Sequence, residues 1–285
     1  MIKLIASDMD GTLLNRDSQV SEENINAIKE ATSKGIRFVI ATGRDYFSVN
    51  NIMKPFGIDC EYVLMNGAEY RDKNGKIIES ININKKKTKN IIDIIDKQNM
   101  SVEIYTSEGI FSADTEEKSL KELTFKIQTI RNIEKYEEAE VIAKNIINSF
   151  GIKYIDNVDK FINSEIDIRK IIAFYNDVEV IKETKGMLDK IDGLAVSSSF
   201  RQNIEVTDQN AQKGLILEKV ISKYGIKKDE TMVLGDSFND KSLFTRFPIS
   251  FAMGNALPEI KELGKYVTAT NNEAGVAKAI YKMIR

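Results

Sequence analysis

The 285-residue sequence contains no histidine and a single cysteine, Cys60. Without histidine, the chain cannot form the Ser-His and Cys-His pairs that activate nucleophiles in many enzymes, and it lacks the commonest zinc ligand. A single cysteine excludes an internal disulfide framework and is typical of a reducing compartment. Any catalysis must therefore depend on carboxylates, lysine, hydroxyl groups and a hard metal ion.

Long apolar runs and a strong excess of one charge are also absent. No apolar stretch approaches the roughly 20 residues that span a bilayer. The N-terminal residues have one lysine before Asp8, which is unlike a secretory signal. The net charge of −2 and the pI of about 5.6 give no electrostatic attraction to nucleic acid or anionic membranes. We therefore expect a cytoplasmic protein without a nucleic-acid or membrane partner, and the sequence does not specify its oligomeric state.

The first fifteen residues contain the clearest pattern for chemistry. Residues 2–6 form a short apolar run, typical of a strand that is buried on both faces, and Asp8 and Asp10 follow it. Gly11 lets the backbone turn sharply, so that both carboxylates can address one ligand. In an open α/β sheet, ligands bind at the carboxyl ends of the strands, which would place these acids at the mouth of a site. Taken alone, the pattern is also typical of a polar turn that caps a helix.

Short apolar runs that end in polar residues recur along the chain. A helix expected between Ser21 and Gly35 is followed by such a run at residues 36–41, which gives a β-α-β unit with a right-handed parallel crossover. Further runs lie at residues 63–65, 231–234, 249–253 and 266–268. We expect these runs to form the strands of an α/β core with a parallel sheet. Residues 70–80 are expected to form a hairpin.

The pattern changes between residues 84 and 207. An amphipathic helix is expected at residues 85–98, a hairpin at 102–113, helices at 116–127 and 133–147, and strands at 170–175 and 194–199. No cluster of catalytic-looking acids follows these strands. We therefore expect an inserted α+β domain at residues 84–207, flanked by core segments 1–83 and 208–285. Lys85, Lys86 and Lys87 are interpreted as a solvated helix start rather than a binding patch.

The polar residues at the expected strand ends form a set that balances in charge. Asp8, Asp10, Asp236 and Asp240 are hard oxygen ligands of the kind that Mg²⁺ prefers, and Lys213 adds a fixed positive charge at a helix start. A phosphate monoester is a dianion, so several carboxylates can share a site with it only if cations lie between them. The set therefore suits phosphoryl transfer, in which positioning and charge neutralisation provide most of the catalysis.

Neutral donors complete the set. Thr42, Gly43 and Asn239 can supply a hydroxyl group, a backbone N–H and an amide to phosphate oxygens. Each piece also has a plainer interpretation: Lys213 as an exposed helix lysine, the Thr42-Gly43 pair as part of a loop, and residues 235–240 as a helix cap. Because every cluster follows a strand, their combination favours the functional interpretation.

Four motifs resemble those of the haloacid dehalogenase-like hydrolase superfamily. They are Asp8-Met-Asp-Gly-Thr-Leu-Leu14, Ala41-Thr-Gly-Arg44, Lys213-Gly214 and Gly235-Asp-Ser-Phe-Asn-Asp240. The insertion after residues 66–68 and the tail at residues 252–277 resemble its Cof-type phosphatases, subclass IIB. The motifs cover the expected core, whereas the insertion matches in position and α+β character. The segment before Lys213 lacks the proline and glycine often seen there.

The resemblance implies a Rossmann-like, doubly wound parallel sheet with a mobile α+β cap domain, Mg²⁺ dependence and an aspartyl-phosphate intermediate. By position, it implies that Asp8 is the nucleophile and a metal ligand. Asp10 is the general acid/base and binds the metal through its backbone carbonyl. Asp236 is a direct metal ligand, and Asp240 supports the metal shell through water. The residues expected to hold the phosphate are Met9 through its backbone, Thr42, Gly43, Lys213 and Asn239.

Three functions are consistent with these motifs. The leading hypothesis is a Mg²⁺-dependent phosphatase of small phosphorylated metabolites, for which sugar phosphates, nucleotides, pyridoxal phosphate and flavin phosphates all satisfy the motifs. A phosphomutase would use the same residues and pass the phosphoryl group to a sugar hydroxyl instead of water. A ligand-sensing protein without turnover is the third. The intact acids and Lys213 argue against it, because a retired site has no reason to keep a charge-balanced set.

Overall fold

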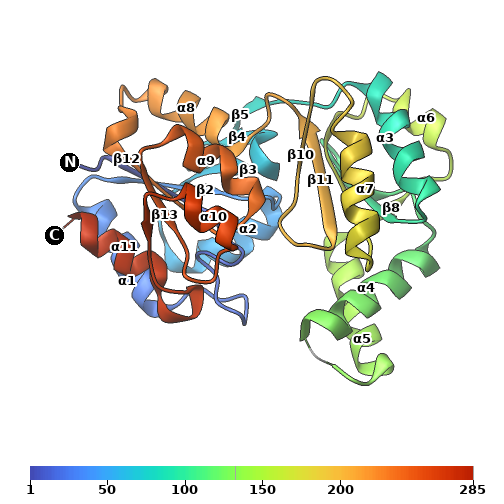
Figure 1. Cartoon of the computed structure of the whole chain (residues 1–285), viewed down its shortest axis with the longest axis horizontal. Helices are drawn as coiled ribbons and strands as arrows, with labels where there is room; N and C mark the ends of the chain where they lie inside the picture. Colours follow the sequence, from blue (N-terminus) through green and yellow to red (C-terminus); the bar gives the residue numbers. More distant parts are fainter. Residues whose placement is uncertain (132, 285) are drawn as a thin grey trace. The chain divides into compact units, whose positions relative to one another are not determined.

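The computed structural model describes residues 1–131 and 133–284 (Figure 1). Within these residues, the fold divides into two compact units. The first unit comprises Met1–Ile81, Ser197–Ser199 and Gln209–Arg285, and the second comprises Asn82–Val196 and Phe200–Asp208. None of the described helices combines the length and the apolar character needed to cross a membrane.

The first unit is built on a mostly parallel sheet. Its strands, in sheet order, are β14 (Tyr266–Val267), β13 (Ile249–Ala252), β12 (Thr231–Gly235), β1 (Leu4–Ser7), β2 (Arg37–Ala41), β3 (Glu61–Leu64), β4 (Glu69–Arg71) and β5 (Ile77–Ser80). Neighbours from β14 to β3 are parallel, whereas β4 and β5 are antiparallel. The predicted parallel α/β core is confirmed.

Helices cover both faces of this sheet. They are α1 (Glu22–Ser33), α2 (Tyr46–Met53), α8 (Lys213–Lys223), α9 (Lys241–Arg246), α10 (Pro258–Leu263) and α11 (Gly275–Ile284), with 3₁₀ turns η1 (Lys54–Phe56), η2 (Met65–Gly67), η3 (Lys228–Glu230), η4 (Phe238–Asp240) and η5 (Asn271–Glu273). Figure 1 shows α1 and α11 side by side on one face and α8 and α9 on the other.

Strand β1 is apolar throughout because both of its faces are covered. Ile5 belongs to the apolar cluster that includes Ile28 of α1 and Ile280 of α11. Leu4 belongs to the cluster on the opposite face, together with Leu217 of α8. A strand buried on both faces reads as a continuous apolar run rather than as an alternating one. The apolar sequence of β1 therefore predicts its central position in the sheet.

The second unit contains a mixed sheet. Its strands, in sheet order, are β10 (Leu194–Ser197), β11 (Asn203–Asp208), β9 (Ile168–Phe174), β6 (Ser101–Thr106), β7 (Gly109–Ser112) and β8 (Lys153–Tyr154), and its helices are α3 (Lys85–Lys97), α4 (Glu116–Arg131), α5 (Tyr136–Phe150), α6 (Val158–Ile162) and α7 (Val178–Leu188). One apolar cluster joins the sheet to α3, α6 and α7. Helices α4 and α5 share a smaller cluster of their own.

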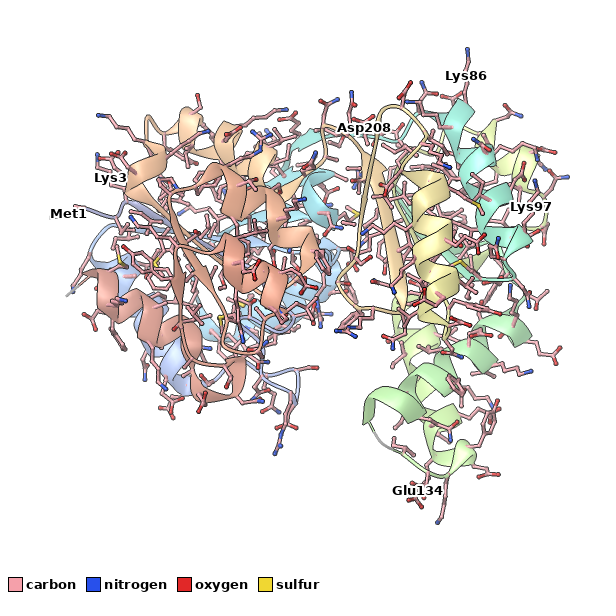
Figure 2. The ribbon with its side chains drawn as sticks, viewed as in Figure 1. Met1, Lys3, Lys86, Lys97, Glu134 and Asp208 are labelled. Carbon is pink, nitrogen blue, oxygen red and sulfur yellow. The ribbon has the colours of Figure 1, made fainter. Side chains whose placement is uncertain are left out.

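The lysines at the start of α3 have different surroundings. Lys86 is exposed and its side chain points away from the protein (Figure 2). Lys85 and Lys87 are partly buried and donate hydrogen bonds to the backbone carbonyls of Ser164 and Asp192. The interpretation of a solvated helix start therefore describes Lys86, while its two neighbours tie α3 to adjacent loops.

Candidate active site

The site residues of the first unit follow strands that lie side by side in the sheet. Asp8 follows β1, Thr42 follows β2 and Asp236 follows β12. Because β1 is paired in parallel with both β2 and β12, the carboxyl ends of the three strands meet at one edge. The backbone N–H of Asp8 donates to the carbonyl of Leu234 at 3.0 Å, which ties the turn after β1 to the end of β12.

Lys213 contacts three of the residues predicted for the site. Its Nζ is 2.7 Å from Oδ1 of Asp8, 2.7 Å from Oδ1 of Asp240 and 3.3 Å from Oδ1 of Asn239. The lysine side chain is completely buried, although it belongs to the first turn of α8. The plainer interpretation of an exposed helix lysine is therefore wrong.

Asp8, Asp236 and Asp240 form a carboxylate cluster, each offering an oxygen that lies within 4.8 Å of the others. The hydroxyl group of Thr12 donates to Oδ1 of Asp236 at 2.9 Å. Oδ2 of Asp240 accepts the backbone N–H groups of Asp236 at 2.9 Å and Ser237 at 3.2 Å. These bonds fix the positions of the Asp236 and Asp240 carboxylates.

Gly11 is required by the close approach of Asp236. Its φ of +76° lies in the left-handed region that favours glycine. A Cβ at this position would lie 2.4 Å from Oδ2 of Asp236. The turn that carries Asp8 away from β1 can therefore pack against Asp236 only without a side chain.

Burial and crowding change the pKa values within the carboxylate cluster. Burial raises the pKa of Asp8 well above its ordinary value; Lys213 opposes this, and the charges of Asp240 and Asp236 add to it. Burial, followed by the charge of Asp240, raises the pKa of Asp236 to about 7. Burial lowers the pKa of Lys213, but the carboxylates of Asp240 and Asp8 outweigh it, so that this pKa is raised.

The donor set of the carboxylate cluster fits a hard divalent cation. Its ligand atoms are carboxylate oxygens, which Mg²⁺ and similar cations prefer. Asp8, Asp236 and Asp240 carry three formal negative charges against one positive charge on Lys213, which leaves a formal charge of −2. A divalent cation would neutralise this remainder and offset the repulsion that, after burial, raises the pKa values of Asp8 and Asp236.

Asp10 does not join the carboxylate cluster, because its side chain is paired with Arg44. Nε of Arg44 donates to Oδ2 of Asp10 at 2.7 Å, and Nη2 donates to Oδ1 at 2.6 Å. Burial lowers the pKa of Arg44, but the hydrogen bonds and charge of Asp10 outweigh it and raise this pKa. A guanidinium that holds both oxygens of a carboxylate fixes its position and its plane.

The residues predicted to hold a phosphate group lie around this cluster. Thr42 is fully buried, and its Oγ1 accepts the backbone N–H of Arg44 at 3.2 Å. Gly43 lies between these two residues in the chain. Asn239 reaches Lys213 through Oδ1. Met9 buries its side chain in the core, so that only its backbone remains for contact with a ligand.

Three further residues belong to this site without a predicted role. Arg44 holds Asp10, Thr12 holds Asp236, and Asn66 accepts a hydrogen bond from Nδ2 of Asn239 at 3.3 Å. Arg44 and Thr12 stand inside the motifs quoted from the sequence, and Asn66 follows β3. Their position after a strand could therefore have marked them as site residues. Their hydrogen-bond partners could not be predicted, because those depend on tertiary structure.

Comparisons with known proteins identify the family. The family model of haloacid dehalogenase-like hydrolases matches residues 5–280. The chain belongs to this family. A haloacid dehalogenase-like hydrolase from Bacillus subtilis with a solved structure is 31% identical, with a TM-score of 0.88 over 99% of this chain and 100% of that one. The fold alone is shared with the subclass IIB sugar phosphatase BT4131, at a TM-score of 0.76 and 24% identity over 98% of each chain.

Relatives within this hydrolase family are named as phosphatases. Phosphatase YwpJ of Bacillus subtilis (strain 168) is 32% identical over 281 residues, covering 97% of this chain and 98% of its own. The 5-amino-6-(5-phospho-D-ribitylamino)uracil phosphatase YwtE of the same strain is 33% identical over 284 residues, covering 99% and 98%. The resemblance seen in the four motifs is confirmed, as is the expectation of a phosphatase-type hydrolase with a Rossmann-like core.

Proposed function

We propose that this protein is a Mg²⁺-dependent phosphatase that hydrolyses small phosphorylated metabolites through an aspartyl-phosphate on Asp8. The observation that supports this most strongly is the position of Asp8, which shares Lys213 with Asp240 and lies within the carboxylate cluster. A nucleophilic carboxylate needs a dianionic phosphate brought close to it, which requires cations at that point. The names of the relatives agree with this reaction.

In the proposed reaction, an oxygen of Asp8 attacks phosphorus, and the bond from phosphorus to the leaving oxygen breaks. Asp10 gives its proton to that leaving oxygen and later takes one from the water that attacks the aspartyl-phosphate. This attack breaks the bond between phosphorus and the Asp8 oxygen and releases phosphate. Arg44 holds Asp10 beside the site through both carboxylate oxygens, and one of these bonds must open before Asp10 can carry the proton. The charge of Lys213 neutralises the phosphoryl oxygens. Neutral donors bind them as well, namely the hydroxyl group of Thr42 and the backbone N–H groups of Gly43 and Met9.

The proposed metal shell uses the same acids. Asp8, Asp236 and the backbone carbonyl of Asp10 would hold Mg²⁺ directly, and Asp240 would support it through water. Bound Mg²⁺ supplies positive charge that orients the phosphate and stabilises its transition state. Asn239 completes the surroundings of Lys213 and is placed to contact the phosphate as well.

We further assign residues 84–207 as the inserted cap domain of the family, and residues 1–83 and 208–285 as its core. The single cysteine, Cys60, is a buried free thiol, which supports a cytoplasmic location. For the substrate, the relative that acts on 5-amino-6-(5-phospho-D-ribitylamino)uracil provides the first compound to assay. A panel of sugar phosphates, nucleotides, pyridoxal phosphate and flavin phosphates should be tested beside it.

A generic aryl phosphate assayed with Mg²⁺, and again with a chelator, tests the reaction. We expect activity that depends on the metal and that falls by at least about a thousandfold in Asp8→Asn. Asp17→Asn is the matched control, since Asp17 is an exposed acid of the same unit. Full activity of Asp8→Asn would exclude Asp8 as the nucleophile. Transfer of the phosphoryl group between two sugar positions, without release of free phosphate, would favour a phosphomutase.

A further inference from the structure

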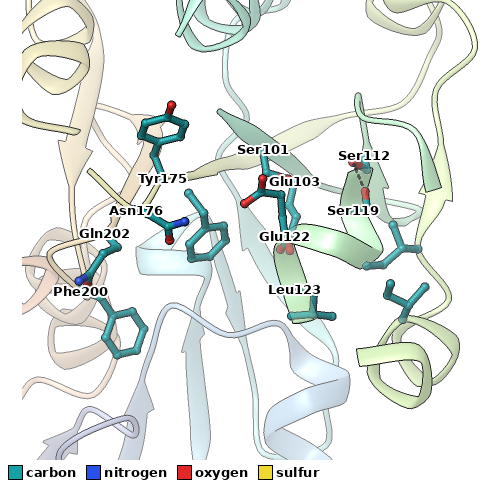
Figure 3. A pocket seen from close by; sticks show the side chains of 13 residues that line it. Ser101, Glu103, Ser112, Ser119, Glu122, Leu123, Tyr175, Asn176, Phe200 and Gln202 are labelled. Atoms are coloured by element: carbon teal, nitrogen blue, oxygen red, sulfur yellow. Dashed lines mark hydrogen bonds between the residues drawn. The ribbon is translucent and has the colours of Figure 1, made fainter. Parts of the chain in front are cut away.

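A cavity of about 130 Å³ lies in the second unit, away from the four motifs in sequence. Its lining residues all belong to that unit. Ser101 on β6 and Asn203 on β11 are both aligned with Phe174 at the end of β9, so three strand ends meet at one edge of the sheet. Helix α4 closes another wall with Glu122, which lies beside Glu103 of β6 (Figure 3). We name this cavity the glutamate pocket.

The polar wall of the glutamate pocket can accept hydrogen bonds and is negatively charged. Among the described residues, no lysine or arginine lines the pocket. The hydroxyl group of Tyr105 donates to Oε2 of Glu103 at 3.3 Å. Ser112 already donates to the carbonyl of Val102 at 2.9 Å. The two carboxylates are therefore the charged groups in this wall that can accept N–H donors from a ligand.

The opposite wall is aromatic and amide-rich. Figure 3 shows Phe200, Gln202 and Asn176 on the side of the pocket that faces Glu103 and Glu122. Phe200 is 52% exposed, so that part of its ring is accessible to a flat molecule. The amides of Gln202 and Asn176 can both donate and accept hydrogen bonds.

We propose that the glutamate pocket binds a flat heteroaromatic ring that carries amino groups. An anion would be repelled by Glu103 and Glu122, and a purely polyhydroxylated sugar would leave Phe200 uncovered. An amino-substituted ring satisfies both walls, because its N–H groups donate to the carboxylates while its face stacks on Phe200. Ring nitrogens and carbonyl groups have partners in the amides of Asn176 and Gln202.

Such a ring can reach the glutamate pocket as a separate molecule or as the non-phosphorylated end of a substrate. The second source rests on the function proposed above, whereas binding of the free ring does not. A binding measurement without turnover therefore tests the pocket by itself. An activity measurement then decides between the two sources.

The binding test uses calorimetric titration of the full-length protein with 2,4-diaminopyrimidine, in the presence of a chelator. Pyrimidine lacks the amino groups and cyclohexylamine lacks the aromatic ring, and we expect both to bind at least about tenfold more weakly. Glu122→Gln keeps the size of the side chain and removes its charge, and should weaken binding of 2,4-diaminopyrimidine by about tenfold or more. Glu103→Gln is the second variant, should the first not fold.

Glu117→Gln is the matched control, because Glu117 is an exposed acid on the same helix that does not line the glutamate pocket. Its affinity for 2,4-diaminopyrimidine should equal that of the wild type. The proposal is overturned if 2,4-diaminopyrimidine does not bind at millimolar concentration. It is also overturned if pyrimidine binds as tightly, or if neither Glu122→Gln nor Glu103→Gln weakens binding.

The activity test compares hydrolysis of 5-amino-6-(5-phospho-D-ribitylamino)uracil with that of ribitol 5-phosphate, which lacks the ring. If the ring arrives as part of the substrate, Glu122→Gln raises KM for the first compound by a factor at least about tenfold larger than any change in KM for the second. If it arrives as a separate molecule, free 2,4-diaminopyrimidine changes hydrolysis of ribitol 5-phosphate in the wild type, and this effect is lost in Glu122→Gln. Equal kinetics of the wild type and Glu122→Gln in both assays, with no effect of the free ring, would contradict a role of the pocket in this enzyme.

Discussion

Replacing Lys213 by methionine tests whether the buried lysine stabilises the carboxylate cluster. The substitution keeps the apolar part of the side chain and removes a charge that lies 2.7 Å from both Asp8 and Asp240. Removing one partner of a buried ion pair costs about 3–5 kcal/mol, because the other partner is left without compensation. A protein of this size loses roughly 2–4 °C of Tm for each kcal/mol. We therefore expect the metal-free Lys213→Met variant to unfold about 10 °C below the wild type at pH 8.

The assay is scanning calorimetry of the metal-free protein, with Lys219→Met as the matched control. Lys219 lies on the same helix, α8, but its side chain is 51% exposed and pairs with Glu79. Exposed ion pairs contribute roughly 0.2–1 kcal/mol, so the control should lose only a few degrees at most. Lys213→Met should also lower kcat/KM by about a hundredfold or more, since a fixed positive charge near the phosphate is lost. If the two variants unfold at the same temperature, Lys213 does not stabilise the cluster as its contacts indicate.

Three further predictions concern the same site. Gly11→Ala would place a Cβ 2.4 Å from Asp236 at a φ of +76°. The affinity for Mg²⁺ in calorimetric titration should therefore fall by about tenfold or more, while the circular dichroism spectrum stays native. Unchanged affinity would contradict this. Arg44→Lys replaces the paired contacts with Asp10 by a single one, so kcat should fall about 10- to 100-fold with a smaller change in KM, and wild-type kcat would refute the positioning role. The pKa of Asp236 is raised from 3.8 to about 7, so the folded metal-free protein binds this proton more tightly than the unfolded chain does. Its Tm should therefore fall as the pH rises from about 4 to 7, and an equally steep fall in Asp236→Asn would count against this origin.

The strands of the first unit could be predicted because buried strands of a parallel sheet form short apolar runs in the sequence. Residues of β1 and β12 are buried on both faces, and each strand reads as an apolar run that ends at a polar cluster. Strand β11 was not predicted, because buried polar side chains, among them Asn203 and Glu205, interrupt its apolar residues. Glu205 is paired there with the buried Lys170 of β9. Such a pair places charged residues inside the sheet, so that β11 does not read as a continuous apolar run, whereas β9 keeps enough apolar residues to be predicted.

The site could be predicted as a set of residues, but not as a set of contacts. Strand ends and motif order point to Asp8, Asp236 and Lys213, and the structure brings all three together. The pairing of Asp10 with Arg44 depends on which way two side chains turn after strands β1 and β2. Sequence spacing does not contain that information, because both side chains leave the same edge of the sheet and could turn toward several neighbours.

The charges of the site are consistent with the proposed use of both a lysine and a metal. The carboxylate cluster and Lys213 leave a formal charge of −2, which a divalent cation would bring to zero. An arriving phosphate dianion adds a further −2, and the nearby guanidinium of Arg44 is already held by Asp10. In the proposed reaction, the phosphate would therefore share the cation and Lys213 with Asp8, beside the proposed nucleophile. Lys213 alone does not offset the burial of so many like charges, since burial raises the pKa of Asp8 even with Lys213 beside it.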